Sequence, residues 1–315
     1  MSRFPLAPPA PTCEEARMTR STPDILCIGS ALWDIIGRHP GVMAHGNDVP
    51  GRVRRIPGGV ALNVAVALAR FGLRPALLTS LGRDAEGDEL SATLHTMGID
   101  CGHAFRDPDR PTDTYLAIED ANGLVAAVAD AHSLEAAGAR ILAPLSDGGL
   151  ADAAAPWTGP VVLDGNLTEE LLAEISVSPL LAQSNLHVVP ASPGKALRLR
   201  PLIAMANATL FLNRIEADAL SGRASRNAVE AAEAVLGLGA ARVIVTDGPH
   251  VAADGDRQGI ITATPPCVAI RRVTGAGDTC LAAHIAAERR GLDREAALLA
   301  AVTAAADHVA GKDPS

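Results

Sequence analysis

The chain has 315 residues, of which 48% are hydrophobic and 20% charged, and its formal net charge is −9 at pH 7. This length and apolar content suffice for one large α/β domain with a buried core. Because an acidic chain with two Trp, one Tyr and four Phe lacks the basic surface and the stacking side chains of a nucleic-acid-binding protein, that class is excluded.

The first 22 residues are predicted to be a disordered, proline-rich leader, so that the folded domain occupies residues 23–315. Met18 is an alternative translation start to Met1. The leader lacks a basic start followed by an apolar stretch, and no apolar run reaches the ~18–20 residues of a membrane span. We therefore expect a cytoplasmic protein whose five scattered cysteines are reduced.

The next predicted elements are a strand, a helix and a second strand. Apolar residues 24–29 predict the first strand, and the glycines at 58 and 59 open a helix that continues through residue 71 and ends at Gly72. Residues 76–87 then read as a short apolar strand followed by a charged turn.

Two segments depart from this alternation of strands and helices, at residues 35–56 and 112–130. In the second segment, Asn122-Gly123 lies between two apolar runs, which predicts a β-hairpin. An ordinary surface hairpin would have the same sequence pattern.

The second half of the chain alternates strand-like apolar runs with Ala- and Leu-rich helical runs, which predicts βα units on a parallel sheet. The strand-like runs cover residues 161–164, 186–189, 208–213 and 242–248. Because ligands of such sheets bind outside the carboxyl ends of the strands, Asp164, Asn213 and Thr246 are candidate site residues by position. Each would serve equally well as a turn former.

Lysine is scarce, since only Lys195 and Lys312 occur among 27 basic residues. A lysine retained in the string Pro-x-Ser-x-x-Lys at 190–195 suggests a site that needs a compact charge where a planar guanidinium would not fit. Chance retention of a surface lysine explains Lys195 as well, and Lys312 is assigned to the surface.

The string Gly275-Ala276-Gly277-Asp278 stands where a loop becomes an apolar helix. The N–H groups of residues 275–277 would be unpaired at the helix start and would form a cradle for an oxyanion, aided by the helix dipole. Asp278 beside that anion is a candidate base that accepts a proton from an attacking alcohol. The alternative is an ordinary Asp cap after a glycine turn.

The Gly-Gly string that ends in Asn63, followed near the C-terminus by Gly-Ala-Gly-Asp, resembles the motifs of the ribokinase/PfkB family of sugar and nucleoside kinases. The likeness extends over roughly residues 24–311. It implies an α/β fold, namely a ribokinase-like three-layer α/β/α sandwich with a mostly parallel central sheet. Segments 35–56 and 112–130 would form a small β lid over the sugar site that excludes water.

Within this family, the strings at 113–130, 189–196 and 212–217 look like the pseudouridine kinase branch. Two positions depart from that branch: Val189 stands where an Asp is usual, and Leu62 where an Arg is common. The sequence therefore leaves open a related kinase for ribose, a ketose or a conventional nucleoside, and a non-enzymatic binding relative.

The resemblance implies ATP as phosphoryl donor, Mg²⁺, and K⁺ as a candidate activating ion. No P-loop or dinucleotide fingerprint is present. The expected nucleotide contacts are Asn213, Thr246, Asp247, Gly248, Gly275 and Gly277, with Glu216 as an outer-shell metal ligand. The expected contacts of the acceptor are Asp34, Gly58, Gly59, Asn63, Thr114, Asp130, Asp164 and Lys195. The partner would be a free small-molecule sugar or nucleoside, and the resemblance further suggests a homodimer formed through the lid.

Overall fold

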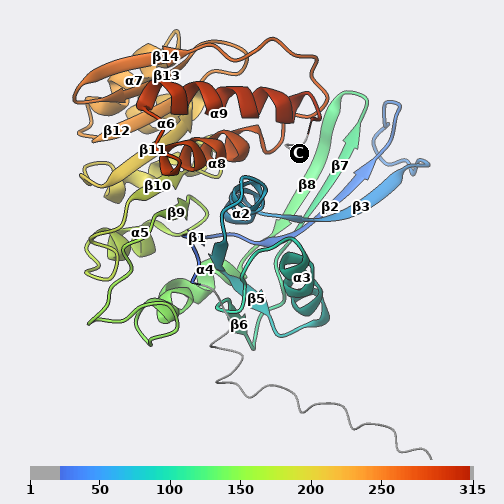
Figure 1. The fold of residues 1–315 in the computed structure, drawn as a ribbon. Coiled ribbons are helices and arrows are strands. Elements are labelled where there is room, and N and C mark those ends of the chain that lie inside the picture. Colours follow the sequence, from blue (N-terminus) through green and yellow to red (C-terminus); the bar gives the residue numbers. More distant parts are fainter. Residues whose placement is uncertain (1–21, 313–315) are drawn as a thin grey trace, which may run out of the picture.

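The structure is a computed structural model that describes residues 22–312. Its main body is a sheet of eight strands in the order β14-β13-β12-β11-β10-β9-β1-β4 (Figure 1). From β4 to β12 the strands are parallel, whereas β13 and β14 are antiparallel additions at one edge. The strands are β1 Ile25–Ile28, β4 Pro75–Leu78, β9 Val161–Asp164, β10 Leu186–Val189, β11 Ala208–Asn213, β12 Arg242–Thr246, β13 Ala252–Asp256 and β14 Gly259–Ala263. The predicted mostly parallel sheet is confirmed.

Helices cover both faces of this sheet, which gives the predicted three layers. Successive side chains of a strand point to opposite faces, so Leu26 and Ile28 of β1 join one apolar cluster while Ile25 and Cys27 join the other. The first cluster includes residues of α4 Ser133–Ala137, α5 Glu169–Ser176, α6 Arg214–Ser221, α7 Ala228–Leu236 and the 3₁₀ helices η1 Gly138–Leu145 and η2 Pro193–Leu202. The second includes residues of α2 Val60–Arg70, α3 Ala85–Thr96, α8 Ala276–Arg289 and α9 Arg294–Val309.

A separate four-stranded sheet, the lid sheet, projects from the main body (Figure 1). Its order is β3-β2-β7-β8, with bounds β2 Leu32–Arg38, β3 Arg52–Gly58, β7 Thr114–Asp120 and β8 Gly123–Asp130. The predicted hairpin between β7 and β8 is confirmed, with Asp120 opposite Gly123, whose φ of 107° suits the tight turn. The lid sheet exposes a set of large apolar side chains, which we call the lid patch: Val53, Leu116, Ile118, Leu124, Val125 and Val128.

The short apolar strand predicted at the start of residues 76–87 is interrupted in the structure. The chain leaves the central sheet after β4, and β5 Ser80–Gly82 pairs instead with β6 Phe105–Asp107 in a small parallel sheet. Part of the predicted charged turn belongs to α3, because Asp84 caps that helix by accepting a hydrogen bond from the Gly87 N–H at 2.8 Å.

The remaining expectations concern the leader, the membrane and the cysteines. The predicted leader, apart from residue 22, and Met18 lie outside the described residues. Between residues 22 and 312, none of the helices combines the length and the apolar character that a bilayer span requires. Within the same range, Cys27, Cys101, Cys267 and Cys280 are free thiols.

Candidate active site

The carboxyl ends of the central strands meet at one edge of the sheet, as the sequence predicts. Asp164 at the end of β9 pairs with Val189 at the end of β10, and Asn213 at the end of β11 pairs with Thr246 at the end of β12. These four residues therefore end neighbouring parallel strands at the same edge, where ligands of open α/β sheets bind. Helix α8 places Asp278 in electrostatic range of Asp164 and Glu216.

Helix α8 begins with the glycine-rich string. Gly275 is the N-cap with a φ of 83°, a conformation that favours glycine, and a Cβ there would approach the His308 ring at 3.2 Å. A Cβ on Gly277 would meet no atom within 4 Å, so the first turn opens onto free space. The predicted cradle of three amides needs a correction: the Ala276 N–H donates to the Val273 carbonyl at 3.2 Å, because the preceding loop forms a tight turn. We therefore expect the anion-binding amides to be those of Gly275 and Gly277.

Asp278 occupies the first turn of α8, where its half-buried carboxyl accepts a hydrogen bond from the Asn63 side chain of α2. Burial, with a smaller effect of the nearby carboxylates of Asp164 and Glu216, raises the pKa of this carboxyl to about 7 against the opposing effect of the Asn63 hydrogen bond. A carboxyl that titrates near neutrality, with a helix N-terminus beside it, is suited to accept a proton at physiological pH.

The Asp164 carboxylate is fully buried, and it accepts hydrogen bonds from five protein groups. One oxygen accepts from the Ser30 N–H at 2.9 Å, the Ser30 hydroxyl at 2.5 Å and the Ala61 N–H of α2 at 3.1 Å. The other accepts from the backbone and side-chain N–H groups of Asn166, at 2.7 and 2.9 Å. Asp164 was predicted to contact the acceptor. Because five protein donors already surround the Asp164 carboxylate, we expect Asp164 to hold in place the residues that contact the acceptor.

Lys195 joins the same network. Its Nζ donates to the Asn166 side-chain oxygen at 2.6 Å, while the Asn166 amide nitrogen also donates to the Ser30 hydroxyl at 2.9 Å. Sequence reasoning missed Ser30 and Asn166. Each lies one or two residues beyond a predicted strand, which is the signal that selected Asp164.

The predicted acceptor contacts of the lid sheet do not all come together. Asp34 of β2 lies against Gly58 of β3, which leaves no room for a side chain at that glycine, and burial raises the pKa of Asp34 to about 6. Thr114 pairs with both Trp33 and Asp130 in the sheet register. Because neighbouring residues of a strand face opposite sides, the register places Thr114 and Asp130 on the lid face opposite to Asp34.

Gly59 has a different role at the start of α2. Its φ is 104°, and a Cβ there would lie 2.5 Å from the Ser30 carbonyl oxygen. The backbone of α2 therefore approaches residue 30 closely, which brings Gly59 and Asn63 next to the Asp164 network.

A cavity of about 470 Å³ lies on the other side of the α8 N-terminus. It is lined by the predicted residues Thr246, Gly248 and Gly277, and by apolar walls that the sequence did not reveal, among them Pro265, Pro266, Val268, Ile270, Val302 and Val309. A mostly apolar cavity with backbone amides at one end fits a planar base linked to phosphates. Asp247 does not line it, because its carboxylate is paired with Arg214 at 2.9 Å.

Asn213 and Glu216 form a capping box at the start of α6. The Asn213 side-chain oxygen accepts from the Glu216 N–H, and the Glu216 carboxylate accepts from the Asn213 N–H, both at 2.9 Å. Burial raises the pKa of Glu216 to about 7. Within residues 22–312 no three His, Cys, Asp or Glu side chains gather as a metal cage.

Comparison with known proteins adds to this geometry. Residues 22–312 match the sequence model of the pfkB family of carbohydrate kinases. A pseudouridine kinase from Escherichia coli is 29% identical over 263 residues, covering 82% of this chain and 81% of that protein. A nucleoside kinase from Methanothermobacter thermautotrophicus is 33% identical over 107 residues, 31% of this chain and 32% of its own. A solved ribokinase from Arabidopsis thaliana, complexed with ribose and ATP, shares the fold with a TM-score of 0.74, at 19% identity and with 92% and 93% of the two chains covered.

The raised pKa of Asp278 predicts a pH-dependent stability difference for Asp278→Asn. An unfolded aspartate titrates near pH 4, whereas folding raises the pKa of Asp278 to about 7. Between these values the folded protein keeps a proton that the unfolded chain releases, so this group lowers the free energy of unfolding as pH rises to about 7. We expect the variant, measured by urea unfolding, to gain stability relative to the wild type between about pH 5 and pH 8. The exposed control Asp109→Asn should show a constant difference, and an equally constant difference for Asp278→Asn would contradict the assignment.

Proposed function

The chain belongs to the pfkB family of carbohydrate kinases, and within this family we propose that it phosphorylates the 5′-hydroxyl of pseudouridine with ATP. That it is a kinase of the carbohydrate and nucleoside class follows from the family match. The observation that carries the reaction is Asp278, whose carboxyl has a pKa raised to about 7 and lies at an open helix N-terminus. The specific acceptor is supported by the similarity to the E. coli pseudouridine kinase over most of both chains.

In the proposed reaction Asp278 acts as general base. Its carboxylate takes the proton of the 5′-hydroxyl as that oxygen forms a bond to the γ-phosphorus, and the bond from phosphorus to the departing ADP oxygen breaks. The Gly275 and Gly277 amides would stabilise charge on the transferred phosphoryl group. Asn63 holds the Asp278 carboxyl by its hydrogen bond and thereby keeps it in place.

The nucleotide would occupy the apolar cavity next to α8, with its base between the Thr246–Gly248 turn and the C-terminal helices. Its phosphates would then approach the α8 N-terminus, as helix dipoles favour. Mg²⁺ would supply charge neutralisation at the phosphates, and the buried carboxyl of Glu216 would reach it through water.

The acceptor would lie between the lid sheet and α2. Asp34, the Gly59 backbone and Asn63 supply the carboxylate, amide and side-chain groups that bind a ribose diol. Lys195, through its contact with Asn166, supplies a cation at the same edge, and such a charge suits a base that carries two carbonyl oxygens.

A second candidate is another sugar or nucleoside as acceptor. The partial match to a nucleoside kinase favours it, as does Val189, which is 8% exposed and packs into the apolar core where the pseudouridine kinase branch usually has Asp. Leu62, which is wholly buried in the same core cluster where that branch commonly has Arg, favours the second candidate in the same way.

The direct test is a product assay with ATP and Mg²⁺, with and without K⁺, on pseudouridine, uridine, adenosine, ribose and fructose. We expect pseudouridine monophosphate to be the dominant product by mass spectrometry, and turnover to stop when Mg²⁺ is chelated. A dominant product from another acceptor would support the kinase activity but contradict pseudouridine as the acceptor. Omission of K⁺ shows whether a monovalent cation activates the enzyme.

The second test removes the base. Asp278→Asn should lower turnover at least ~10²-fold, the scale of a positioned general base, while the KM for ATP changes little. The wild-type rate should rise with pH through about 7, as the Asp278 carboxyl ionises. The matched control Asp109→Asn should keep the wild-type rate, and near wild-type turnover in Asp278→Asn would rule out this role.

The lid patch leads to a proposal on assembly. Leu116, Leu124 and Val128 are 42%, 61% and 64% exposed, which is unusual for large apolar side chains on one sheet. We propose that two copies pair through this patch. Light scattering should give a dimer mass that falls to a monomer mass in Leu124→Glu/Val128→Glu, whereas a monomeric wild type would exclude the pairing.

A further inference from the structure

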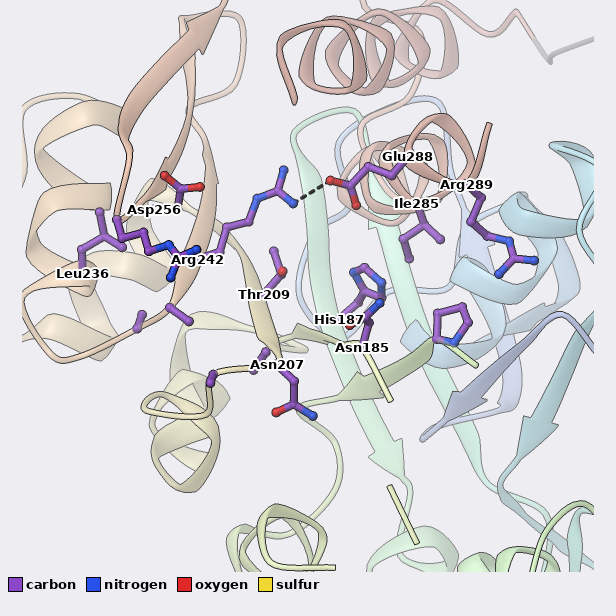
Figure 2. Close-up of a pocket in the computed structure, with 16 residues that line it drawn as sticks. Asn185, His187, Asn207, Thr209, Leu236, Arg242, Asp256, Ile285, Glu288 and Arg289 are labelled. Carbon is purple, nitrogen blue, oxygen red and sulfur yellow. Dashed lines mark hydrogen bonds and ion pairs between the residues drawn. The ribbon is translucent and has the colours of Figure 1, made fainter. Parts of the chain in front are cut away.

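A second and larger cavity lies at the amino ends of the central strands, away from the candidate active site. Figure 2 shows the residues that line it. Its volume is about 820 Å³. Pro160, Asn185, Asn207 and Ala241 line it, and each directly precedes one of the strands β9 to β12. The cavity therefore opens at the amino ends of the strands whose carboxyl ends carry the active-site residues.

One wall of the cavity is a fixed ionic network. Arg242 donates to Asp254 at 2.7 Å and to Glu288 of α8 at 2.6 Å, and the second pair spans the cavity wall in Figure 2. Asp256 is paired with Arg294 at 2.8 Å. Both carboxylates that line the cavity, Asp256 and Glu288, are thus already neutralised by arginines.

Two further arginines line the cavity without such a pair. Within residues 22–312, the exposed side chains of Arg257 and Arg289 make no hydrogen bond or ion pair; Arg289 acts only at longer range, where it lowers the pKa of Asp24. Figure 2 shows Arg289 on the far side of the cavity from Asp256, the neighbour of Arg257 in the chain. An excess of positive charge in a cavity stands out in a chain whose net charge is −9, and it favours an anionic ligand.

Neutral polar groups lie between these arginines. The exposed Asn185 offers an amide, Thr209 a hydroxyl, and Asn207 a side-chain oxygen, since its amide nitrogen already donates to the Ser184 carbonyl at 2.7 Å. The His187 ring also lines the cavity and is uncharged at neutral pH, because burial lowers its pKa to about 4. These groups can donate to and accept from a sugar or a base, so the polar body of a ligand has partners here.

We propose that this cavity binds a phosphorylated metabolite of mononucleotide size, with its phosphate on one of the two guanidinium groups, that of Arg257 or that of Arg289, and its polar body against Asn185, Asn207 and Thr209. Guanidinium groups bind phosphates and carboxylates alike. The volume falls in the range of about 300–1,000 Å³ that holds whole ligands, and it exceeds what a small dicarboxylate fills. The site is separate from the kinase reaction and does not depend on which acceptor is used.

The test measures the NMR signal of the His187 ring, which lines this cavity and not the cavity beside α8. The protein is labelled with ¹³C at the histidine ring, the His187 signal is assigned with His187→Gln, and UMP and AMP are titrated to millimolar concentration. We expect a saturable shift of the His187 signal with one of the nucleotides and none with uridine or adenosine. Arg257→Gln/Arg289→Gln should weaken the binding about tenfold or more. The control Arg200→Gln, at an exposed arginine of η2, should leave it unchanged.

Three results would overturn the proposal. The first is the absence of any shift with either nucleotide, and the second is an equal shift in the Arg257→Gln/Arg289→Gln protein, which would place the bound nucleotide elsewhere. The third is a shift with citrate but not with the nucleotides, which would replace a phosphate ligand with a carboxylate. Because both arginines are exposed and unpaired within the described residues, we expect the double variant to fold, and its melting temperature checks this.

Discussion

The hydrogen bonds of the buried Asp164 carboxylate organise the part of the candidate site where we expect the acceptor to bind. An ion in the protein interior is tolerated only when hydrogen bonds replace its hydration, and here five donors do so. Those donors come from the loop after β1, the first turn of α2 and the loop after β9. One side chain thus ties three separate segments together. Its bulk also explains Gly29, where a Cβ would collide with the Asp164 side chain.

The hydrogen bonds of Asp164 also fix the positions of other residues of the candidate site. The position of α2 sets Asn63, and Asn63 in turn holds Asp278 of α8 by a hydrogen bond. On the other side Asn166 holds Lys195 at 2.6 Å. The charges of Asp164 and Glu216 also make ionisation of Asp278 less favourable. The same sheet edge therefore both positions the proposed base and sets the pH at which it works.

Much of this arrangement could be predicted from sequence because its signals are local. Apolar runs marked β9 to β12, and the glycines before Asp278 marked the start of α8. The expectations that the structure revises involve contacts without a sequence signal, either between distant segments or within a turn. The lid faces of Thr114 and Asp130 follow from sheet register, the Asp247 carboxylate is taken up by Arg214, and the Ala276 amide is bonded within a turn. Ser30 and Asn166 carry no motif of their own, and the cavity at the amino edge is built from residues that precede four separate strands.

The lid sheet is joined to the main body by very short links. Only Gly59 lies between the end of β3 at Gly58 and the start of α2 at Val60. Three residues, 29–31, connect β1 to β2. Gly59 and Ser30 are themselves in close contact, and Ser30 is bonded to Asp164. Because these connections are so short, any rotation of the lid sheet would require changes in the backbone torsion angles of these few residues. A rotation of the lid sheet would therefore shift Ser30 and Gly59, which lie beside the Asp164 network, so that movement of this sheet and rearrangement of the candidate site would be coupled.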